Sequence, residues 1–354
     1  MAPALSLYLD FVRFSAAMIV FFGHISGDRF TGGLFWQFGL FMDEAVTVFF
    51  VLSGYVIAYV IDTRERSVEA YSAARAARVL SVAVPAVLLT FLLDTVGRTL
   101  RPDLYGLWWG YQTDGQLWQF LSALLFIGRL WYMEVGVGSN LPYWSLHYEV
   151  WYYIIFAGLV FAPKRWRVPA VIGLLLLVGP PIFVLFPVWL MGVVAYRISA
   201  SGQLGPVTGA FLALACLVLL FLLEFAKLRY GQLPSMSVQP RMTNDYVVGL
   251  LFSAHLVGVQ AAARRIPPVP AFLEAPIRWL AGATFTIYLL HLPVSQFLTT
   301  VVPWPPDAWQ TRLVIFGGGL VILFAIAAGT ERRKDIWRRG IGWVTRSLRP
   351  KAGT

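Results

Sequence analysis

Charged residues are scarce in this chain of 354 residues. Asp, Glu, Lys and Arg together make up 13% of it, whereas hydrophobic residues make up 58%. A soluble globular protein carries about 25% charged residues, so this chain has too little polar surface to cover a water-soluble body. The composition therefore excludes a soluble protein and a disordered chain, and it predicts a membrane protein.

Cysteine is nearly absent as well. The single cysteine, Cys216, lies in an apolar run and has no second cysteine to pair with, which excludes a disulfide scaffold. The net charge is +10, a value that would indicate a nucleic-acid partner in a polar protein. In a chain this apolar, Lys and Arg in short cytoplasmic loops explain the charge better, so we expect no nucleic-acid partner.

Long hydrophobic runs are abundant instead. A helix needs about 20 residues to cross the hydrocarbon core of a bilayer. We therefore predict an all-α polytopic membrane protein with ten transmembrane helices near residues 6–27, 40–61, 79–97, 144–162, 168–184, 185–200, 206–226, 246–263, 278–302 and 310–329. The fifth and sixth segments are short and share breaks at Pro180-Pro181 and Pro187. The segment 117–131 is too short for a span, and we expect an interfacial or re-entrant helix on the outer face.

The distribution of Lys and Arg predicts how the helices are oriented. With the N-terminus in the cytoplasm, the cytoplasmic loops and the tail hold more than twice as many Lys and Arg as the outer loops. This asymmetry predicts a multi-pass protein of the cytoplasmic (inner) membrane with both termini in the cytoplasm. We assign residues 1–331 to one transmembrane domain. Residues 332–354 form a basic cytoplasmic tail, expected to lie as a helix on the membrane surface.

The first predicted span contains three ionisable residues, Asp10, Arg13 and His24. Each ionisable residue inside a span costs about 2.5–3.5 kcal/mol on insertion scales, so such residues are functional candidates. Asp10 and Arg13 are one helical turn apart and can pair. Arg13 and His24 fall within about 20° of the same helix face and about 16 Å apart. An anchoring ion pair with an interfacial histidine fits the same spacing equally well.

Two further sets of polar residues stand at the ends of predicted spans. Glu149 lies about one turn inside the fourth span, near the depth of His24; a solvated first-turn carboxylate is the alternative. Arg75 and Arg78 are one turn apart at the cytoplasmic start of the third span. Two guanidinium groups on one helix face suit a phosphate-bearing ligand, although anchoring at the membrane surface is the commoner use of such arginines.

Several short motifs follow one another along nearly the whole chain. They are Leu9 to Ala17 continuing to His24, Phe49-Phe50-Val51-Leu52-Ser53-Gly54-Tyr55, the pair Arg75 and Arg78, Trp144-Ser145-Leu146-x-x-Glu149-x-x-x-Tyr153, Tyr288-Leu289-x-His291, and Glu331. With these motifs in this order, the chain resembles the integral-membrane acyltransferase family 3, whose members O-acylate cell-surface glycans. The family often has an aspartate where this chain has Thr47, and Asp43 and Glu44 are the candidate substitutes.

The resemblance implies a donor, an acceptor and a set of site residues. The donor would be acetyl-CoA from the cytoplasm, and the acceptor a hydroxyl group of an extracytoplasmic glycan or glycolipid; no metal is implied. The implied roles are catalysis by His24, Glu149 and Arg13, donor binding by Arg75, Arg78 and Arg13, and support by Asp10, Ser53, Tyr55, Trp144, Ser145, Tyr153, Tyr288, His291 and Glu331. His24 would act either as general base or as a transient acyl carrier, with Glu149 orienting its imidazole.

The main alternative is a transporter or flippase for a glycan or small anionic substrate. Buried charges and broken helices also mark the substrate path in that class. Its signature is a pair of broken helices in two matching halves, and the break at 180–187 has no counterpart here. Membrane lipid is an expected partner of either class, and formation of a homo-oligomer is left open.

Overall fold

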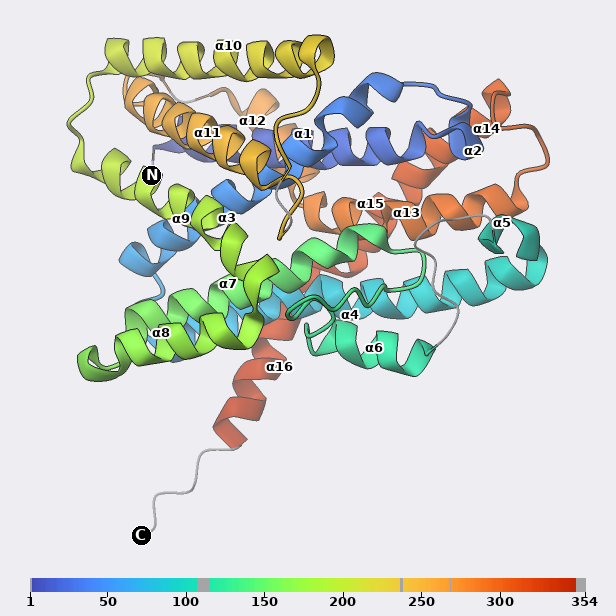
Figure 1. Cartoon of the computed structure of the whole chain (residues 1–354), viewed down its shortest axis with the longest axis horizontal. Coiled ribbons are helices and arrows are strands. Elements are labelled where there is room, and N and C mark those ends of the chain that lie inside the picture. The colour runs from blue at the N-terminus through green and yellow to red at the C-terminus, as the bar shows by residue number, and fades with distance from the viewer. Residues whose placement is uncertain (1, 107–114, 236–237, 268, 348–354) are drawn as a thin grey trace.

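The computed structural model describes residues 2–106, 115–235, 238–267 and 269–347, and every regular element in these ranges is helical (Figure 1). The α-helices are α1 (Pro3–Ile25), α2 (Asp28–Thr31), α3 (Met42–Thr63), α4 (Val68–Leu100), α5 (Pro102–Gly106), α6 (Gln116–Leu124), α7 (Trp144–Phe161), α8 (Lys164–Val178), α9 (Pro180–Ser201), α10 (Pro206–Tyr230), α11 (Met242–Ala263), α12 (Ala271–Ala281), α13 (Thr284–Val301), α14 (Trp309–Leu313), α15 (Gly319–Gly329) and α16 (Lys334–Ser347). Short 3₁₀ turns cover Trp36–Phe41, Leu141–Tyr143 and Glu331–Arg333, and a π-helix covers Val314–Gly318.

Local sequence explains where several long helices begin. Pro3, Pro180 and Pro206 stand in the first turn of α1, α9 and α10, where the fixed φ of proline suits a helix and its missing N–H is not needed. Ser67 caps α4, because its side chain accepts a hydrogen bond of 3.2 Å from the backbone N–H of Ala70.

The structure confirms the predicted all-α polytopic membrane protein. Within the described residues, seven helical stretches are long and apolar enough to cross a membrane: α1, residues 36–63 with α3, α4, α9, α10, α11, and residues 309–340 with α14 and α15. The other three predicted spans coincide with α7, α8 and α13, which have 18, 15 and 18 residues. The count of ten spans is therefore not confirmed and stays a prediction.

Three predicted boundaries differ from the structure. The break between the fifth and sixth segments lies at Gly179, and Pro187 is inside α9. Gly179 has φ +81°, and a Cβ there would lie 2.6 Å from the Cα of Trp131, so only glycine fits. The ninth segment is divided between α12 and α13. The tenth is interrupted by the π-helix. Besides these three, the short helix expected over 117–131 is helical only as far as Leu124.

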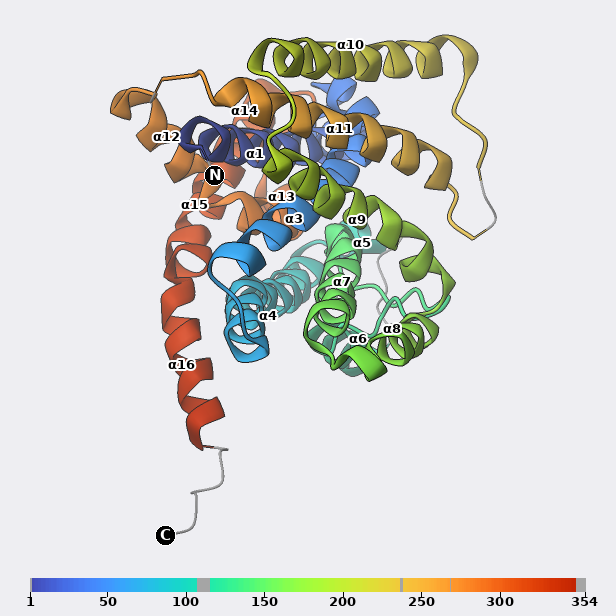
Figure 2. The ribbon, with the colours of Figure 1, turned by 90° about the vertical axis from the view of Figure 1, so that its left-hand side faces the viewer.

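The basic tail begins as predicted with a helix, α16, after the 3₁₀ turn at Glu331–Arg333. Figure 2 shows α16 projecting from the body of the molecule beside α4. Residues 348–354 of the tail lie outside the described residues. Contact of α16 with a membrane surface stays a prediction.

Close contact between α3 and α9 places α3 in the middle of the bundle. A Cβ on Gly54 would collide with the carbonyl oxygen of Trp189, and a Cβ on Gly192 would collide with that of Val51. Small residues let helix backbones approach in this way inside membranes. The glycine of the Ser53-Gly54 motif is therefore required for packing, and it leaves the opposite face of α3 for the site described next.

Candidate active site

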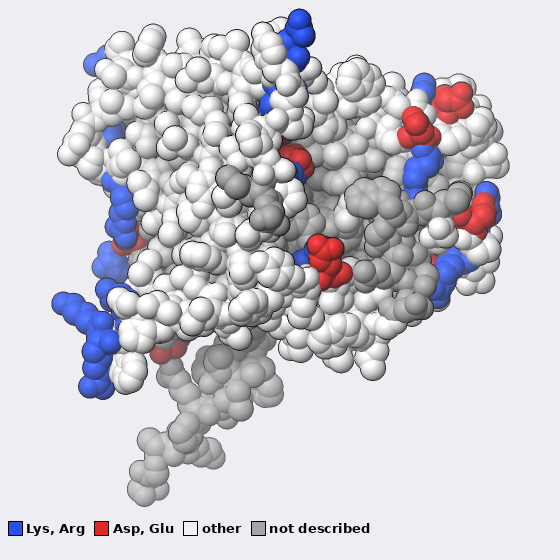
Figure 3. Space-filling view, in the orientation of Figure 1, with Lys and Arg blue, Asp and Glu red and all other residues white. Residues whose placement is uncertain are grey.

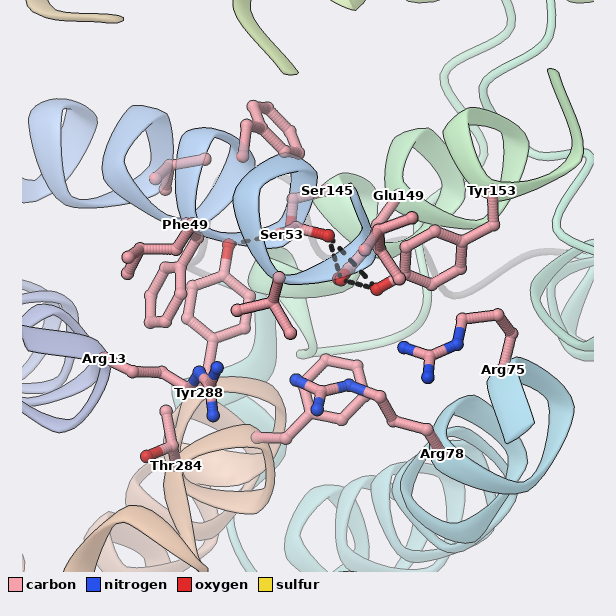
Figure 4. A pocket seen from close by; sticks show the side chains of 16 residues that line it. Arg13, Phe49, Ser53, Arg75, Arg78, Ser145, Glu149, Tyr153, Thr284 and Tyr288 are labelled. Atoms are coloured by element: carbon pink, nitrogen blue, oxygen red, sulfur yellow. Dashed lines mark hydrogen bonds between the residues drawn. The ribbon is translucent and has the colours of Figure 1, made fainter. Parts of the chain in front are cut away.

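A pocket between α1, α3, α4, α7 and α13 brings together most of the predicted site residues (Figure 4). We call it the basic pocket. It is lined by Arg13, Val46, Phe49, Phe50, Leu52, Ser53, Val56, Ile57, Arg75, Arg78, Ser145, Glu149, Tyr153, Thr284, Phe285 and Tyr288. Half of these residues were predicted from short motifs that lie far apart in the sequence, so the fold assembles the motifs into one site.

Three arginines point toward the middle of the basic pocket (Figure 4). Arg75 donates from Nη2 to Glu65 Oε1 at 2.7 Å, while its buried Nε has no hydrogen-bond partner among the described residues. The Arg78 guanidinium lies 5.9 Å from the Phe285 ring centre. Arg13 Nη1 lies 3.6 Å from Asp10 Oδ1, which confirms the predicted Asp10–Arg13 pair. Many of the donors of these groups are thus left for an anionic ligand.

The opposite wall of the basic pocket carries a hydrogen-bonded carboxylate. Ser53 donates to Glu149 Oε1 at 3.1 Å, and the hydroxyl of Tyr153 donates to the same oxygen from one turn further along α7. Among the described residues Glu149 is hydrogen-bonded to Ser53 and Tyr153, and its expected role in orienting His24 stays a prediction. Glu149 faces the arginines across the pocket, where it balances part of their charge.

His24 and His291 form a pair beyond the basic pocket. His24 Nδ1 lies 3.0 Å from the carbonyl oxygen of Val20 and 3.1 Å from His291 Nε2, and His291 Nδ1 lies 3.0 Å from the carbonyl oxygen of Ile287. With both rings neutral, His291 donates from Nδ1 and accepts at Nε2, so His24 donates from Nδ1. The lone pair of His24 is then on Nε2, which makes no hydrogen bond with a described residue.

Helix α13 connects the histidine pair to the basic pocket. Tyr288 lines the pocket one turn before His291, as the shared helix face predicted. Its hydroxyl lies 2.7 Å from Ser145 Oγ, and because Ser145 donates to the Pro142 carbonyl oxygen, Tyr288 donates to Ser145.

Glu331 positions the start of α13. Its carboxylate accepts hydrogen bonds from the backbone N–H of Thr286 at 2.9 Å and of Phe285 at 3.3 Å, and from the Thr286 hydroxyl at 3.1 Å. A carboxylate at a helix N-terminus satisfies free N–H groups and suits the helix dipole. Thr284, Phe285 and Tyr288 follow directly into the basic pocket, so Glu331 supports the site without lining it.

Besides His24, His291 and Glu331, three further predicted residues lie outside the basic pocket. Tyr55 is buried against Tyr196, with ring centres 5.6 Å apart. Trp144 lies on the other face of α7, where its ring contacts Phe50 and Tyr148. Asp10 binds Arg278 at 2.9 Å as well as Arg13, so it anchors α1 beside the pocket.

Some polar residues of the site were not predicted. Glu65 holds Arg75, and Asp245 Oδ1 accepts a hydrogen bond of 2.7 Å from Thr47. Asp43 and Glu44, the expected substitutes for an aspartate at 47, pair instead with Arg241 and Lys227. Asp245 is 198 residues from Thr47, and its place directly before a predicted span is the signal that could have identified it.

Comparison with known proteins agrees with this arrangement. The family model described as "Acyltransferase domain" matches residues 6–331. A relative, "Exopolysaccharide production protein ExoZ" of Rhizobium meliloti (strain 1021), is 31% identical over 138 residues. That match spans 37% of this chain and 38% of the relative, so it covers well under half of the relative's length. No solved structure matches the chain.

Proposed function

Because the chain belongs to this acyltransferase family, we propose that it is a membrane O-acyltransferase that moves an acetyl group from cytoplasmic acetyl-CoA to a glycan hydroxyl on the other side of the membrane. The observation that carries the proposal is the basic pocket, where Arg13, Arg75 and Arg78 converge beside a helix that leads to the His24–His291 pair. A transporter would need the pocket but not an imidazole with a free Nε2.

The charge on the surface supports an orientation with the pocket open toward the cytoplasm. Lys and Arg side chains line the edge of the molecule at the left of Figure 3, near the N-terminus, whereas most visible Asp and Glu side chains lie toward the other half. This asymmetry follows the positive-inside rule. We therefore propose that the protein lies in the inner membrane with both termini in the cytoplasm, and that Arg75 and Arg78 are on the cytoplasmic side of the pocket.

Each arginine would have a separate task toward acetyl-CoA. Arg75 and Arg78, one turn apart on α4, are suited to the phosphate groups, because a guanidinium binds phosphate oxygens in a bidentate manner. Arg13, on α1, is suited to the pantetheine arm of the donor, because it stands about 16 Å along the helix from His24, where the thioester would react. Glu65 would compete with a phosphate for Arg75.

His24 Nε2 supports two routes. In direct transfer it removes the proton of the acceptor hydroxyl while the oxygen attacks the thioester carbonyl carbon; the C–S bond breaks, and the leaving thiolate of CoA takes up a proton. In the acyl-histidine route Nε2 itself attacks that carbon, the C–S bond breaks and CoA leaves as the thiolate. The acceptor hydroxyl oxygen then attacks the acetyl-imidazole, the N–C bond breaks, and the hydroxyl proton passes to the CoA thiolate. His291 holds the reactive tautomer in both routes.

The relative named for exopolysaccharide production indicates the class of acceptor. We propose that the acceptor is a cell-surface polysaccharide or its lipid-linked precursor.

The test uses the purified full chain in liposomes with radiolabelled acetyl-CoA. We expect label to move to polysaccharide of the source organism, and the absence of any transfer would contradict the proposed function. With donor alone, label bound to the wild-type protein but not to a His24→Ala variant would select the acyl-histidine route. If no label is bound to the wild-type protein under the same conditions, the result would select direct transfer. Uptake of unmodified glycan without transfer would select the transporter.

A further inference from the structure

A second cleft lies on the other face of α7 from the basic pocket. It is formed by the start of α7, the segment between α6 and α7, and the segment before α11, and we call it the aromatic cleft. Its principal lining residues are Arg129, Trp131, Tyr132, Trp144, Tyr148 and Arg241. Four aromatic rings and two guanidinium groups around one hollow are typical of a ligand site rather than of a packing defect.

The first turns of α7 separate the two hollows. Trp144 and Tyr148 are four residues apart and face the aromatic cleft, whereas Ser145 and Glu149, also four apart, face the basic pocket. Phe50 lies between them: its ring centre is 6.5 Å from that of Trp144 and 6.3 Å from that of Tyr148, and it also lines the basic pocket. A ligand in the cleft is thus one helix width from the donor site.

Trp131 is held in an unfavourable backbone conformation at the cleft. Its φ is +53°, a region that non-glycine residues rarely adopt, and its N–H donates to the Val178 carbonyl oxygen at 2.8 Å. The backbone packs against Gly179, yet the side chain is 52% exposed. Strain of this kind persists where the surrounding structure enforces it, and it clusters at functional sites.

The polar groups of the cleft match a carbohydrate. The buried Arg129 Nε has no hydrogen-bond partner among the described residues, so a donor is available to a ligand oxygen. The Arg241 guanidinium lies 5.7 Å from the Trp144 ring centre and is paired with Asp43. Flat aromatic rings cover the C–H faces of a pyranose, and guanidinium groups donate to its hydroxyl or carboxylate oxygens.

Anchoring in the membrane interface is the other use of exposed Trp and Tyr. Interface anchors project outward from the protein surface, whereas Trp131 and Tyr132 share a hollow with Arg129, Glu134 and Arg241. Charged side chains beside the aromatic rings favour a polar ligand over lipid tails.

The rim of the cleft also leads to the histidine pair. Arg241 pairs with Asp43 at the start of α3, and the adjacent Met42 contacts Gly23, the neighbour of His24. These contacts connect the rim of the cleft, through the start of α3, to the end of α1 that carries His24.

We propose that the aromatic cleft binds the acceptor glycan, with sugar rings stacked on Trp131, Tyr132 and Trp144 and with sugar oxygens bound by Arg129. This inference rests on the proposed function, because it assigns the acceptor side of the same reaction.

The test measures binding without catalysis. Oligosaccharides released from the surface polysaccharide of the source organism are titrated calorimetrically into the full chain in lipid nanodiscs, without acetyl-CoA. We expect Trp131→Ala to raise the Kd by about tenfold, the effect of losing about 1.4 kcal/mol. Trp309→Ala, which removes another exposed tryptophan that does not line the cleft, is the matched control and should leave the Kd unchanged.

A second binding experiment identifies the sugar group that Arg129 binds. The same oligosaccharides are compared before and after chemical reduction of their carboxyl groups, with wild type and Arg129→Gln. Weaker binding of the variant to the native form alone indicates a carboxylate, and weaker binding to both forms indicates hydroxyls; either result supports the cleft.

Two results would overturn the inference: no binding of these oligosaccharides to the wild type, or the same Kd for Trp131→Ala as for Trp309→Ala. Acyl transfer by the same preparations separates the two proposals. Transfer that persists with an unchanged acceptor KM in Trp131→Ala refutes the cleft alone, and binding without any transfer refutes the proposed function alone.

Discussion

At the scale of single residues, the nitrogen that we propose to be reactive, His24 Nε2, depends on a hydrogen-bond chain between two histidines. Hydrogen bonds connect the Ile287 carbonyl oxygen to His291 and His291 to His24, and they leave the lone pair of His24 on Nε2. A hydrogen bond to one ring nitrogen sets the tautomer and so decides which nitrogen of the imidazole can react. The short motifs of the sequence marked both histidines, but nothing in their spacing showed that they meet.

The first prediction concerns His24. His24→Ala should lower acyl transfer at least 100-fold, because a general base or acyl carrier typically contributes about 10²- to 10⁴-fold. The measurement is the rate of glycan acetylation in liposomes. The amounts of wild type and variant in the membrane are compared by immunoblot. His255→Gln is the control, since His255 is also buried but binds Tyr8 and the Ala213 carbonyl oxygen away from the site. Retained activity in His24→Ala would remove His24 from the mechanism.

The second prediction concerns the arginine pair. Arg75→Ala combined with Arg78→Ala should raise the KM for acetyl-CoA more than tenfold and change the acceptor KM little, because two charge-assisted contacts of about 1.5–3 kcal/mol each are lost. Glu65→Gln should lower the donor KM, since it frees Arg75 from its 2.7 Å ion pair. The exposed Arg66 is the control position. An unchanged donor KM in the double variant would exclude a phosphate clamp.

At the scale of elements, the apolar runs predicted where helices occur but not where they break. Gly179 ends α8 because Trp131 occupies the space that a Cβ would need, and Trp131 is 48 positions earlier in the chain. The start of α13 is likewise set by a residue that is distant in the sequence, Glu331. The carboxylate that caps α13 comes from a turn after α15, so the sequence around Thr284 contains no sign of it.

The third prediction concerns this cap. Glu331→Ala should destabilise the start of α13 by about 1–3 kcal/mol, because buried N–H groups lose their acceptor. Thermal unfolding of the solubilised protein, followed by size-exclusion chromatography, should show a lower Tm, and transfer activity should fall with it. Glu331→Gln keeps an oxygen acceptor and should have a smaller effect. Glu274→Ala, at an exposed ion pair with Arg278, should leave both unchanged; a normal Tm for Glu331→Ala would contradict the cap.

At the scale of the whole molecule, the orientation of the bundle depends on how many segments cross the membrane. The count changes from ten to eleven if residues 117–131 span it, and the C-terminus then changes sides. Helix α6 covers only nine residues, which at 1.5 Å per residue is about 14 Å and too short to cross. A span by residues 117–131 is therefore disfavoured, while the count of ten stays a prediction.

The fourth prediction follows from that count. A fluorescent protein fused after residue 354 should fluoresce, and alkaline phosphatase fused at the same position should be inactive, because the proposed orientation puts both termini in the cytoplasm. Fusions after Tyr230, between α10 and α11, are the matched control and should give the opposite pattern. Active phosphatase at the C-terminus would contradict the even count and the direction of donor entry.

The sequence by itself determined that this is a helical membrane protein, and it marked Arg13, His24, Arg75, Arg78 and Glu149 as residues that do not belong in lipid. Hydropathy and the cost of buried charge are properties of each residue, so they can be read without the fold. Only the tertiary structure decided the partners: Glu149 faces arginines, His24 meets His291, and α7 places an aromatic cleft behind the basic pocket. Ser53 and Glu149 are 96 residues apart and His24 and His291 are 267 apart, and packing alone brings them together.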